Sequence, residues 1–131
     1  MPTPDSIERE HTLATAVARY NDLAVRDAVA SAGPGEQASG LDQQEALELL
    51  ALGEVIARKA AYGRQLAVRS ARGAGASWAQ IGQALGTTKQ SAWEAHSRWI
   101  DEQAAQRGRT GCVGLDEGEV AAARDLAGDP G

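Results

Sequence analysis

Two helix-start signals lie close together in the segment SWAQIGQALGTTKQSAWEAH, residues 77–96. The pair Ser77 and Gln80 has the spacing of a capping box, in which two side chains satisfy free N–H groups in the first turn of a helix. The pair Thr87 and Gln90 has the same spacing. One helix must therefore end almost where the next begins, and two such short neighbours cannot lie parallel. This tight junction is the strongest constraint on the fold.

Gly86 stands between the two signals, and glycine adopts at little cost the left-handed conformation that ends many helices. Ile81 and Leu85 are four residues apart and give the first helix an apolar face. We expect a first helix of about two turns. A sharp turn at the sequence GTT then leads to a second helix from Thr88 to about Ala104.

The core around this junction has to be built mainly from Leu, Ile, Val and Ala, because only 4% of the residues are aromatic and none is Phe. Such side chains suit helices that approach one another closely. A chain of 131 residues has room for one domain, or for one small domain with appended helices. We therefore predict an all-α fold: a three-helix helix-turn-helix unit with a long preceding helix and an N-terminal helix that forms a helical hairpin.

A long helix is predicted at the start of the chain. It runs from about Ser6 to Ala32 and ends at a linker that contains glycine and proline, residues 31–40. It follows Asp5 and Glu8, which have capping-box spacing. Its apolar stripe consists of Leu13, Val17, Tyr20, Ala24 and Ala28.

A second long helix is predicted from Asp42 to about Arg72, because Asp42 is a good N-cap and Glu45 follows at capping-box spacing. If unbroken, it would be about 45 Å long and would exceed the diameter of so small a domain. We therefore expect a bend, or a projecting half that contacts a partner. Its expected buried face consists of Leu49, Leu52, Ile56, Ala60 and Leu66.

Charge is distributed unevenly along the chain, whose formal net charge is −5. Residues 1–55 hold three Lys or Arg against ten Asp or Glu, and residues 110–131 hold one against five. Residues 56–109 hold nine against three and form a basic island between two acidic flanks. This segment suits an anionic partner, although the negative total would suggest otherwise.

The segment WAQIGQALGTTKQSAWEAH resembles the helix-turn-helix of bacterial DNA-binding proteins, particularly of small actinobacterial regulators. The resemblance covers about residues 66–104 and includes the Ser-Trp-Ala opening and the Ala-Leu-Gly that ends the first helix. It also includes the small Gly82 where the helices cross and the inward-facing Ala92 and Ala95. Thr87 departs from it, because Val or Ile is usual after the turn glycine. The resemblance implies a sequence-specific transcriptional regulator that binds double-stranded DNA.

The start of the second motif helix carries the side chains expected to read bases. A helix presented by this end fits the major groove, and its free N–H groups and positive dipole end favour nearby phosphate. Lys89 can donate to guanine, Gln90 can bond adenine twice, and Glu94 can accept from cytosine. Trp93 either packs on a neighbouring helix or contacts a sugar or a thymine methyl group. The predicted base-reading set is Thr88, Lys89, Gln90, Ser91, Trp93 and Glu94.

Phosphate contacts are predicted from polar and basic side chains around this helix. A group of basic residues can simply be a charged face in contact with water. These residues cluster beside the motif in the sequence, which favours contact with phosphate. Arg58, Lys59 and Arg64 are left open, because they can equally solubilise the long helix or pair with acidic residues. The predicted phosphate-binding set is Arg69, Arg72, Ser77, Gln80, Thr87, Ser97 and Arg98.

Catalytic, metal and cofactor sites are not expected. Cys112 has no nearby His, and no Cys, Asp or His lies at metal-ligand spacing from His96. We place His96 on the helix surface or against a phosphate, and Trp78 and Trp99 in the core. Neither a signal peptide nor a membrane-spanning run is recognised, and a single cysteine fits a reducing compartment. We therefore expect a cytoplasmic protein that is not an enzyme.

The expected organisation has three parts. Residues 1–40 form the N-terminal helix and linker and join a homodimer, since one small module reads too few base pairs. Residues 41–107 form the long helix and the DNA-binding domain, and residues 108–131 form an acidic flexible tail with a possible short helix from Asp116 to Leu126. An ordinary helical hairpin also fits the pattern. The functional alternative is an interaction module whose acidic helices, including the N-terminal one, bind another regulator.

Overall fold

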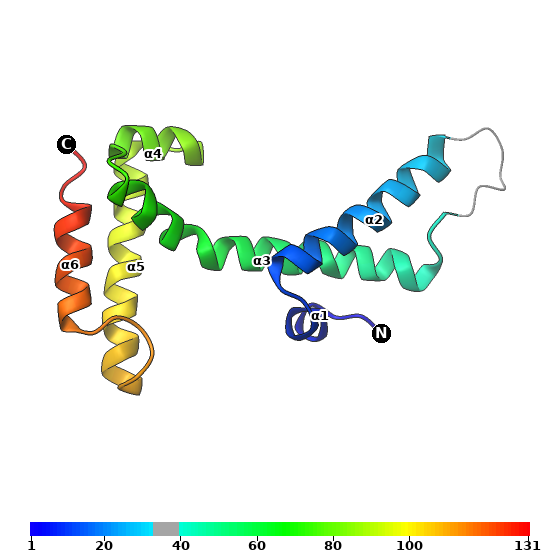
Figure 1. Cartoon of the computed structure of the whole chain (residues 1–131), viewed down its shortest axis with the longest axis horizontal. Coiled ribbons are helices and arrows are strands. Elements are labelled where there is room, and N and C mark those ends of the chain that lie inside the picture. The colour runs from blue at the N-terminus through cyan, green and yellow to red at the C-terminus, as the bar shows by residue number, and fades with distance from the viewer. Residues whose placement is uncertain (33–39) are drawn as a thin grey trace. The chain divides into compact units, whose positions relative to one another are not determined.

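The computed structural model describes residues 1–32 and 40–131, and within them every regular element is a helix (Figure 1). The predicted all-α fold is therefore confirmed. The predicted linker lies largely in residues 33–39, outside the described residues. The helices are α1 (Pro4–Glu10), α2 (Leu13–Ala32), α3 (Gln43–Gly73), α4 (Trp78–Leu85), α5 (Lys89–Thr110) and α6 (Glu117–Ala127).

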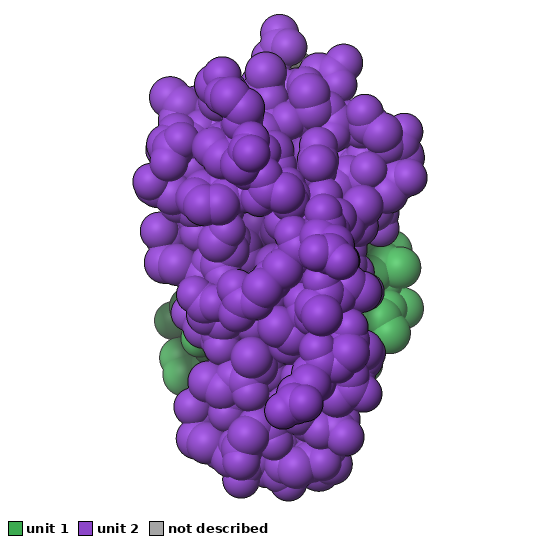
Figure 2. All heavy atoms as spheres, turned by 90° about the vertical axis from the view of Figure 1, so that its left-hand side faces the viewer, with its two compact units in different colours: residues 1–62 green, residues 63–131 purple. Residues whose placement is uncertain are grey.

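The chain forms two compact units, Met1–Tyr62 (unit 1) and Gly63–Gly131 (unit 2), which are coloured separately in Figure 2. Each unit has its own buried core. The division falls inside α3, which supplies residues to both units and continues unbroken past Gly53 and Gly63. The boundaries expected at 40/41 and 107/108 therefore differ from the observed one. The expected boundaries lie at glycine-rich segments of the sequence. The observed division depends instead on which helices pack against one another.

The first predicted helix is in fact two helices. After α1, His11 adopts an extended conformation with φ −123° and ψ 143°. Thr12 then starts α2: its hydroxyl accepts from the Thr15 N–H at 3.2 Å, and its own N–H donates to the Thr15 hydroxyl at 3.0 Å. At its front, α1 is capped by a capping box of Thr3 and Ser6 rather than by the acidic pair predicted from the sequence.

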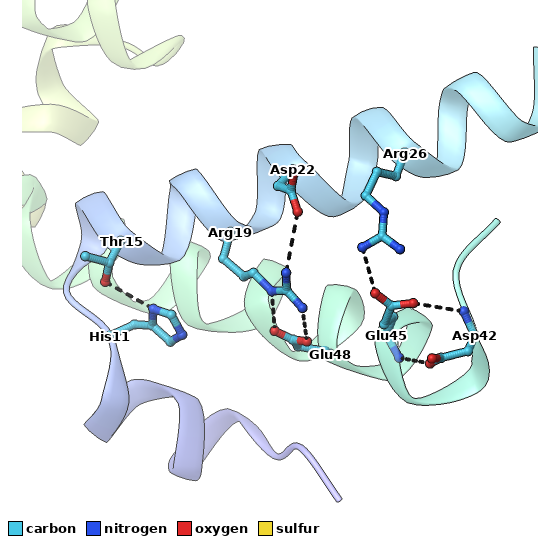
Figure 3. Close-up of polar contacts among 8 residues, drawn as sticks. All are labelled: His11, Thr15, Arg19, Asp22, Arg26, Asp42, Glu45 and Glu48. Carbon is cyan, nitrogen blue, oxygen red and sulfur yellow. Dashed lines mark hydrogen bonds and ion pairs between the residues drawn. The ribbon is translucent and has the colours of Figure 1, made fainter. Parts of the chain in front are cut away.

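Unit 1 packs α1 and α2 against the first part of α3. Two ion pairs join α2 to α3 (Figure 3). Arg19 binds both carboxylate oxygens of Glu48 at 2.7 and 2.9 Å, and Arg26 binds Glu45 at 2.7 Å. These hydrogen bonds from arginine hold the pKa of both carboxyl groups below the ordinary value. The buried residues of unit 1 are Ile7, Ala16, Leu23, Ala51, Leu52 and Val55.

The predicted apolar stripe of α2 does not line this core. Leu13, Val17 and Tyr20 are 40%, 45% and 39% exposed, while Ala16 and Leu23 are fully buried. The core side of α2 is thus rotated away from the predicted stripe. An apolar surface is left open on α2 as a result.

The predicted buried face of α3 is correct in unit 1 and wrong further along the helix. Leu52 is buried, and Leu49 and Ile56 pack against the same core. Ala60 and Leu66 are exposed. The apolar pattern continues along the whole helix, but neighbouring helices cover the predicted face only in its first part.

In unit 2, α4 and α5 form the tight pair expected from the sequence. Ser77 caps α4 in the predicted capping box with Gln80, and Gly86 ends the helix in a left-handed conformation with φ 72°. Only the residues Gly86–Thr88 separate α4 from α5. The two helices pack directly on one another.

The second predicted capping box does not form. Thr88, and not Thr87, caps α5 by accepting the Ser91 N–H at 3.0 Å. The side chain of Gln90 reaches forward to Glu94 instead of back to the cap. The helix therefore starts one residue later than the Thr87 cap required.

Gly82 explains this register, because the backbone of the turn rests against it. A Cβ atom at position 82 would lie 2.9 Å from backbone atoms of Thr87, Thr88 and Lys89. The N–H of Thr87 also donates to the Gly82 carbonyl oxygen at 2.8 Å. This bond keeps Thr87 in the turn and leaves the cap position to Thr88.

The acidic stretch expected as a tail holds α6, which begins with a capping box of Asp116 and Glu119. The short helix left open by the sequence is therefore present. It runs antiparallel to α5 and packs along it (Figure 1). Ala123 and Ala127 are buried, so α6 is part of the core of unit 2. The other buried residues of that core are Val68, Trp78, Ile81, Ala92 and Ile100.

Replacing Gly82 with Ala is expected to lower the free energy of unfolding by about 1–3 kcal/mol, because the new methyl group meets rigid backbone. Denaturant titration followed by circular dichroism measures the change. Gly108→Ala in α5 is the matched control, because nothing lies within 4 Å of a Cβ atom there. The control is expected to be neutral or stabilising by up to about 1 kcal/mol. Equal stability of the two variants would contradict the role assigned to Gly82.

Candidate nucleic-acid interface

The first turns of α5 present an exposed polar surface. Thr88, Gln90, Ser91 and Glu94 are all exposed, and so is Arg98 one turn further along. The amide nitrogen of Gln90 donates to a carboxylate oxygen of Glu94 at 2.9 Å. This bond holds the two side chains together on the outer face of the helix, where they offer further donors and acceptors.

A groove of about 360 Å³ lies beside this surface and is lined by residues of α3, α4 and α5. Arg64 and Arg98 line it together with Thr87 and Ser91. Of the predicted phosphate-binding residues, Thr87 and Arg98 are thus brought together. Guanidinium and hydroxyl donors near the start of a 22-residue helix make a surface suited to an anion. The remaining lining residues are Gln65, Leu85, Ala92 and Ala95.

The three basic residues of α3 left open by the sequence separate clearly. Arg58 forms ion pairs with Asp5 at 3.2 Å and Glu8 at 3.5 Å, so it ties α1 to α3 in unit 1. Arg64 lines the groove. Lys59 is half-buried in unit 1. Only Arg64 therefore joins the candidate interface.

Lys89 and Trp93 do not share the groove and are bound by the end of α6. The Lys89 amine donates to the carbonyl oxygen of Gly131 at 2.8 Å. The indole N–H of Trp93 donates to the carbonyl oxygen of Gly128 at 2.7 Å, and the ring is half-buried. Trp93 packs against the core of unit 2, and its contact with a sugar or a thymine methyl group stays a prediction.

Arg72 is held within the protein rather than free for phosphate. Its guanidinium donates to the carbonyl oxygens of Leu126 at 3.1 Å and of Ala76 at 2.9 Å. The same group lies 5.3 Å from the centre of the Trp78 ring, a favourable cation–π distance. Arg72 thus connects α3 to the end of α6.

Other members of the predicted phosphate-binding set lie apart from the groove. Arg69 is half-buried, with its guanidinium 6.0 Å from the centre of the Trp99 ring. Ser77 and Gln80 are exposed, but their side chains are used in the cap of α4. Ser97 lines a small cavity beside α6. The groove therefore holds only part of the set that the sequence suggested.

His96 is buried, with 1% of its surface exposed, so its predicted place on the helix surface is wrong. Its Nδ1 atom lies 2.9 Å from the side-chain oxygen of Gln65 on α3. Because that partner is an acceptor, Nδ1 carries the proton of the neutral ring. The ring lies 5.6 Å from Trp78 and stacks on Trp99 at 5.4 Å. Trp78 is buried as predicted, whereas Trp99 is only partly buried.

The sequence does contain a signal for the burial of His96. It stands four residues after Ala92 and four before Ile100, and both of these are buried. A residue at this spacing shares the inward face of the helix. A polar side chain is expected inside a protein only where it has a hydrogen-bond partner. The partner Gln65 is 31 residues away, so the sequence around His96 does not indicate it.

Burial lowers the pKa of the His96 imidazole below its ordinary value, and the charges of Arg69 and Arg72 lower it further. The neutral ring is therefore the form that the folded protein prefers.

Within residues 1–32 and 40–131, no group of three or more His, Cys, Asp or Glu side chains is arranged to hold a metal ion. No helix in these two stretches is both long enough and apolar enough to cross a membrane. Comparison with protein-family models, with curated proteins and with solved structures gives no match to this chain. The functional inference therefore starts from the geometry of unit 2.

The free energy of unfolding is expected to fall as the pH is lowered from about 7 to about 5. The unfolded chain protonates this histidine near pH 6.5, whereas folded His96 stays neutral to lower pH. The unfolded state thus binds more protons in this range, which lowers stability. The lowered pKa values of Glu45 and Glu48 act in a separate window, below their ordinary value of 4.5.

Denaturant titrations at pH 7 and pH 5 measure this effect. The control is the variant His96→Gln. Because the substitution also changes packing, the quantity compared is the change in free energy of unfolding between pH 7 and pH 5 within each protein. The variant is expected to lose most of the difference. An equal difference in both proteins would show that another group is responsible.

Proposed function

We propose that this protein is a cytoplasmic, sequence-specific DNA-binding regulator of transcription, in which α4, the turn and α5 act as a helix-turn-helix. The observation that carries the proposal is the basic groove: Arg64 and Arg98 line it together with Thr87 and Ser91, and it extends from the exposed start of α5 to Arg98. Phosphate is the anion that such donors hold in complexes with DNA.

The proposed docking places the first turns of α5 in the major groove, which is about 12 Å wide. Gln90 and Glu94 then face the base edges, because both are exposed on the outer side of the helix. The Gln90 amide suits adenine, and the Glu94 carboxylate accepts from the amino group of cytosine. Their mutual hydrogen bond presents the two groups as one unit. The basic groove meanwhile holds the DNA backbone and sets the register.

The protein is proposed to bind as a homodimer, because one such helix contacts too few base pairs for specific affinity. The open apolar stripe of α2 supports this, with Leu13, Val17 and Tyr20 each at least 39% exposed. Tyr20 also lies 3.6 Å from the Cβ position of Gly53, so the stripe borders α3. Two copies paired in this way would contact half-sites about 34 Å apart or a multiple of that spacing.

Selection from a library of random DNA duplexes, followed by sequencing, tests the function directly. A bound site with two related half-sites is expected. Gln90→Ala is expected to weaken binding to the selected site about tenfold or more while changing non-specific binding little. Arg98→Ala is expected to weaken both, because it holds phosphate. Arg109→Ala, an exposed arginine near the other end of α5, is the control and should change neither.

The dependence of binding on salt separates this function from the alternative. If each protomer neutralises about four phosphates, the slope of log K against log salt for the dimer is about −7. Equal effects of Gln90→Ala on specific and non-specific DNA would contradict its base-reading role. Indifference to DNA at low salt, with capture of another regulator through the acidic helices, would favour a protein-interaction module.

Sedimentation equilibrium tests the dimer independently of DNA. The intact protein is expected at twice the chain mass of 13.6 kDa. Val17→Glu is expected to shift it to the monomer, because a charge is placed in an apolar interface. Val29→Glu is the matched control, since Val29 is 67% exposed on α2 but lies outside the stripe. A monomeric wild type, or the same shift in both variants, would contradict the proposed interface.

A further inference from the structure

The segment after α6, Gly128–Gly131, is hydrogen-bonded to the start of α5. The carbonyl of Gly131 accepts from the Lys89 amine at 2.8 Å, and the carbonyl of Gly128 accepts from the Trp93 indole at 2.7 Å. The antiparallel course of α6 brings its last turn beside the first turn of α5 (Figure 1). One of the three N–H donors of Lys89 and the single indole donor of Trp93 are therefore bonded to the protein itself.

The core of unit 2 does not require the last three residues of this segment. The core ends at Ala127, whose carbonyl accepts from the buried Trp78 indole at 2.7 Å. Beyond it, the Asp129 carboxylate accepts the Gly131 N–H at 3.0 Å, which folds the segment back. Asp129 and Gly131 are both exposed. Pro130 between them is half-buried, and none of the three belongs to the buried core cluster.

We propose that residues 129–131 form an intramolecular cover that competes with DNA for the amine of Lys89. The inference rests on the proposed function and adds a regulation of the same surface. Displacement requires only an exchange of acceptors: an oxygen of DNA replaces the Gly131 carbonyl oxygen as the partner of the same N–H group. Each phosphate of DNA offers a charge-assisted acceptor, so DNA competes with the cover for this N–H group.

The cover also carries negative charge. Arg124 is the one basic residue of α6 and pairs with Asp101 of α5 at 2.7 Å. A DNA backbone that approaches α5 past α6 therefore meets like charge, whereas Arg64 and Arg98 attract it on the groove side. The cover thus lowers affinity and also favours one orientation of DNA. The acidic residues of α6 and the segment after it are Glu117, Glu119, Asp125 and Asp129.

The first experiment measures the cover without DNA. Lys59 and Lys89 are the only lysines in the sequence, so Lys59 is an internal reference for amine acylation followed by mass spectrometry. Deleting residues 129–131 is expected to raise the rate at Lys89, relative to Lys59, by about 2- to 10-fold, the range for loss of one hydrogen bond. An unchanged ratio overturns the proposal. A thermal unfolding curve confirms that the shortened chain is folded.

A second variant keeps the length of the chain. Asp129→Gly combined with Pro130→Gly removes the carboxylate that folds the segment back and frees its backbone. It is expected to raise the rate at Lys89 in the same direction by a smaller factor. No increase in this variant, together with none in the shortened chain, shows that the segment does not cover Lys89.

The second experiment measures affinity for duplex DNA at low salt. The shortened chain is expected to bind about 2- to 10-fold more tightly than the full chain. Asp125→Asn controls for charge, because it removes one negative charge from α6 and leaves the cover in place; its gain is expected to be smaller. When Lys89 is already replaced by Ala, deleting residues 129–131 is expected to raise the affinity for DNA by no more than Asp125→Asn does.

The outcomes distinguish the cover from the proposed function. A gain that persists in full in the Lys89→Ala background overturns the cover, because the effect is then one of charge alone. DNA binding by the full chain that does not change on deletion also overturns the cover and leaves the proposed function intact. Absence of DNA binding in both forms overturns the two together.

Discussion

The arrangement of unit 2 depends on the close approach of the turn to Gly82. The backbone of Thr87, Thr88 and Lys89 occupies the place of a side chain at this position. This contact brings α5 against α4 and makes Thr88 the first cap of α5. The direction and the starting residue of α5 follow from it, and with them the exposed positions of Gln90 and the groove that Arg64 and Arg98 line.

A buried polar pair then connects α5 to α3. Nδ1 of the His96 imidazole and the amide oxygen of Gln65 bond to each other inside the unit, and no fully buried side-chain nitrogen or oxygen among the described residues lacks a partner. Two tryptophans, Trp78 and Trp99, enclose the ring. An apolar residue at position 96 would fill the space but would lack this directional bond, which fixes one helix relative to the other. The helix proposed to read DNA is thereby held on a defined support.

The two sides of α5 serve different purposes. On one side lies a groove lined by two arginines, Arg64 and Arg98, which suits an anion. On the other side, α6 covers the helix, and backbone carbonyls occupy the donors of Lys89 and Trp93. The charge pattern along the chain gains a physical meaning from this layout, because an acidic segment folds back onto the basic island. Under the proposed function, this segment is the competitor of DNA for Lys89.

Local features of this protein could be determined from the sequence alone. The cap at Ser77, the left-handed Gly86 and the all-α fold follow from hydrogen bonds and backbone preferences that act within a few residues. Thr87 and Arg98, two members of the predicted phosphate-binding set, line the same groove, and their contact with phosphate stays a prediction.

Tertiary structure alone decided which faces are covered. The stripe of α2 has the right periodicity but no cover, and the polar His96 is buried because a distant glutamine satisfies it. The cap passes from Thr87 to Thr88 because the turn rests on Gly82. The first two outcomes depend on contacts between segments far apart in the sequence, and the third depends on the way the chain folds back at the turn; the preferences of single residues carry no information about either.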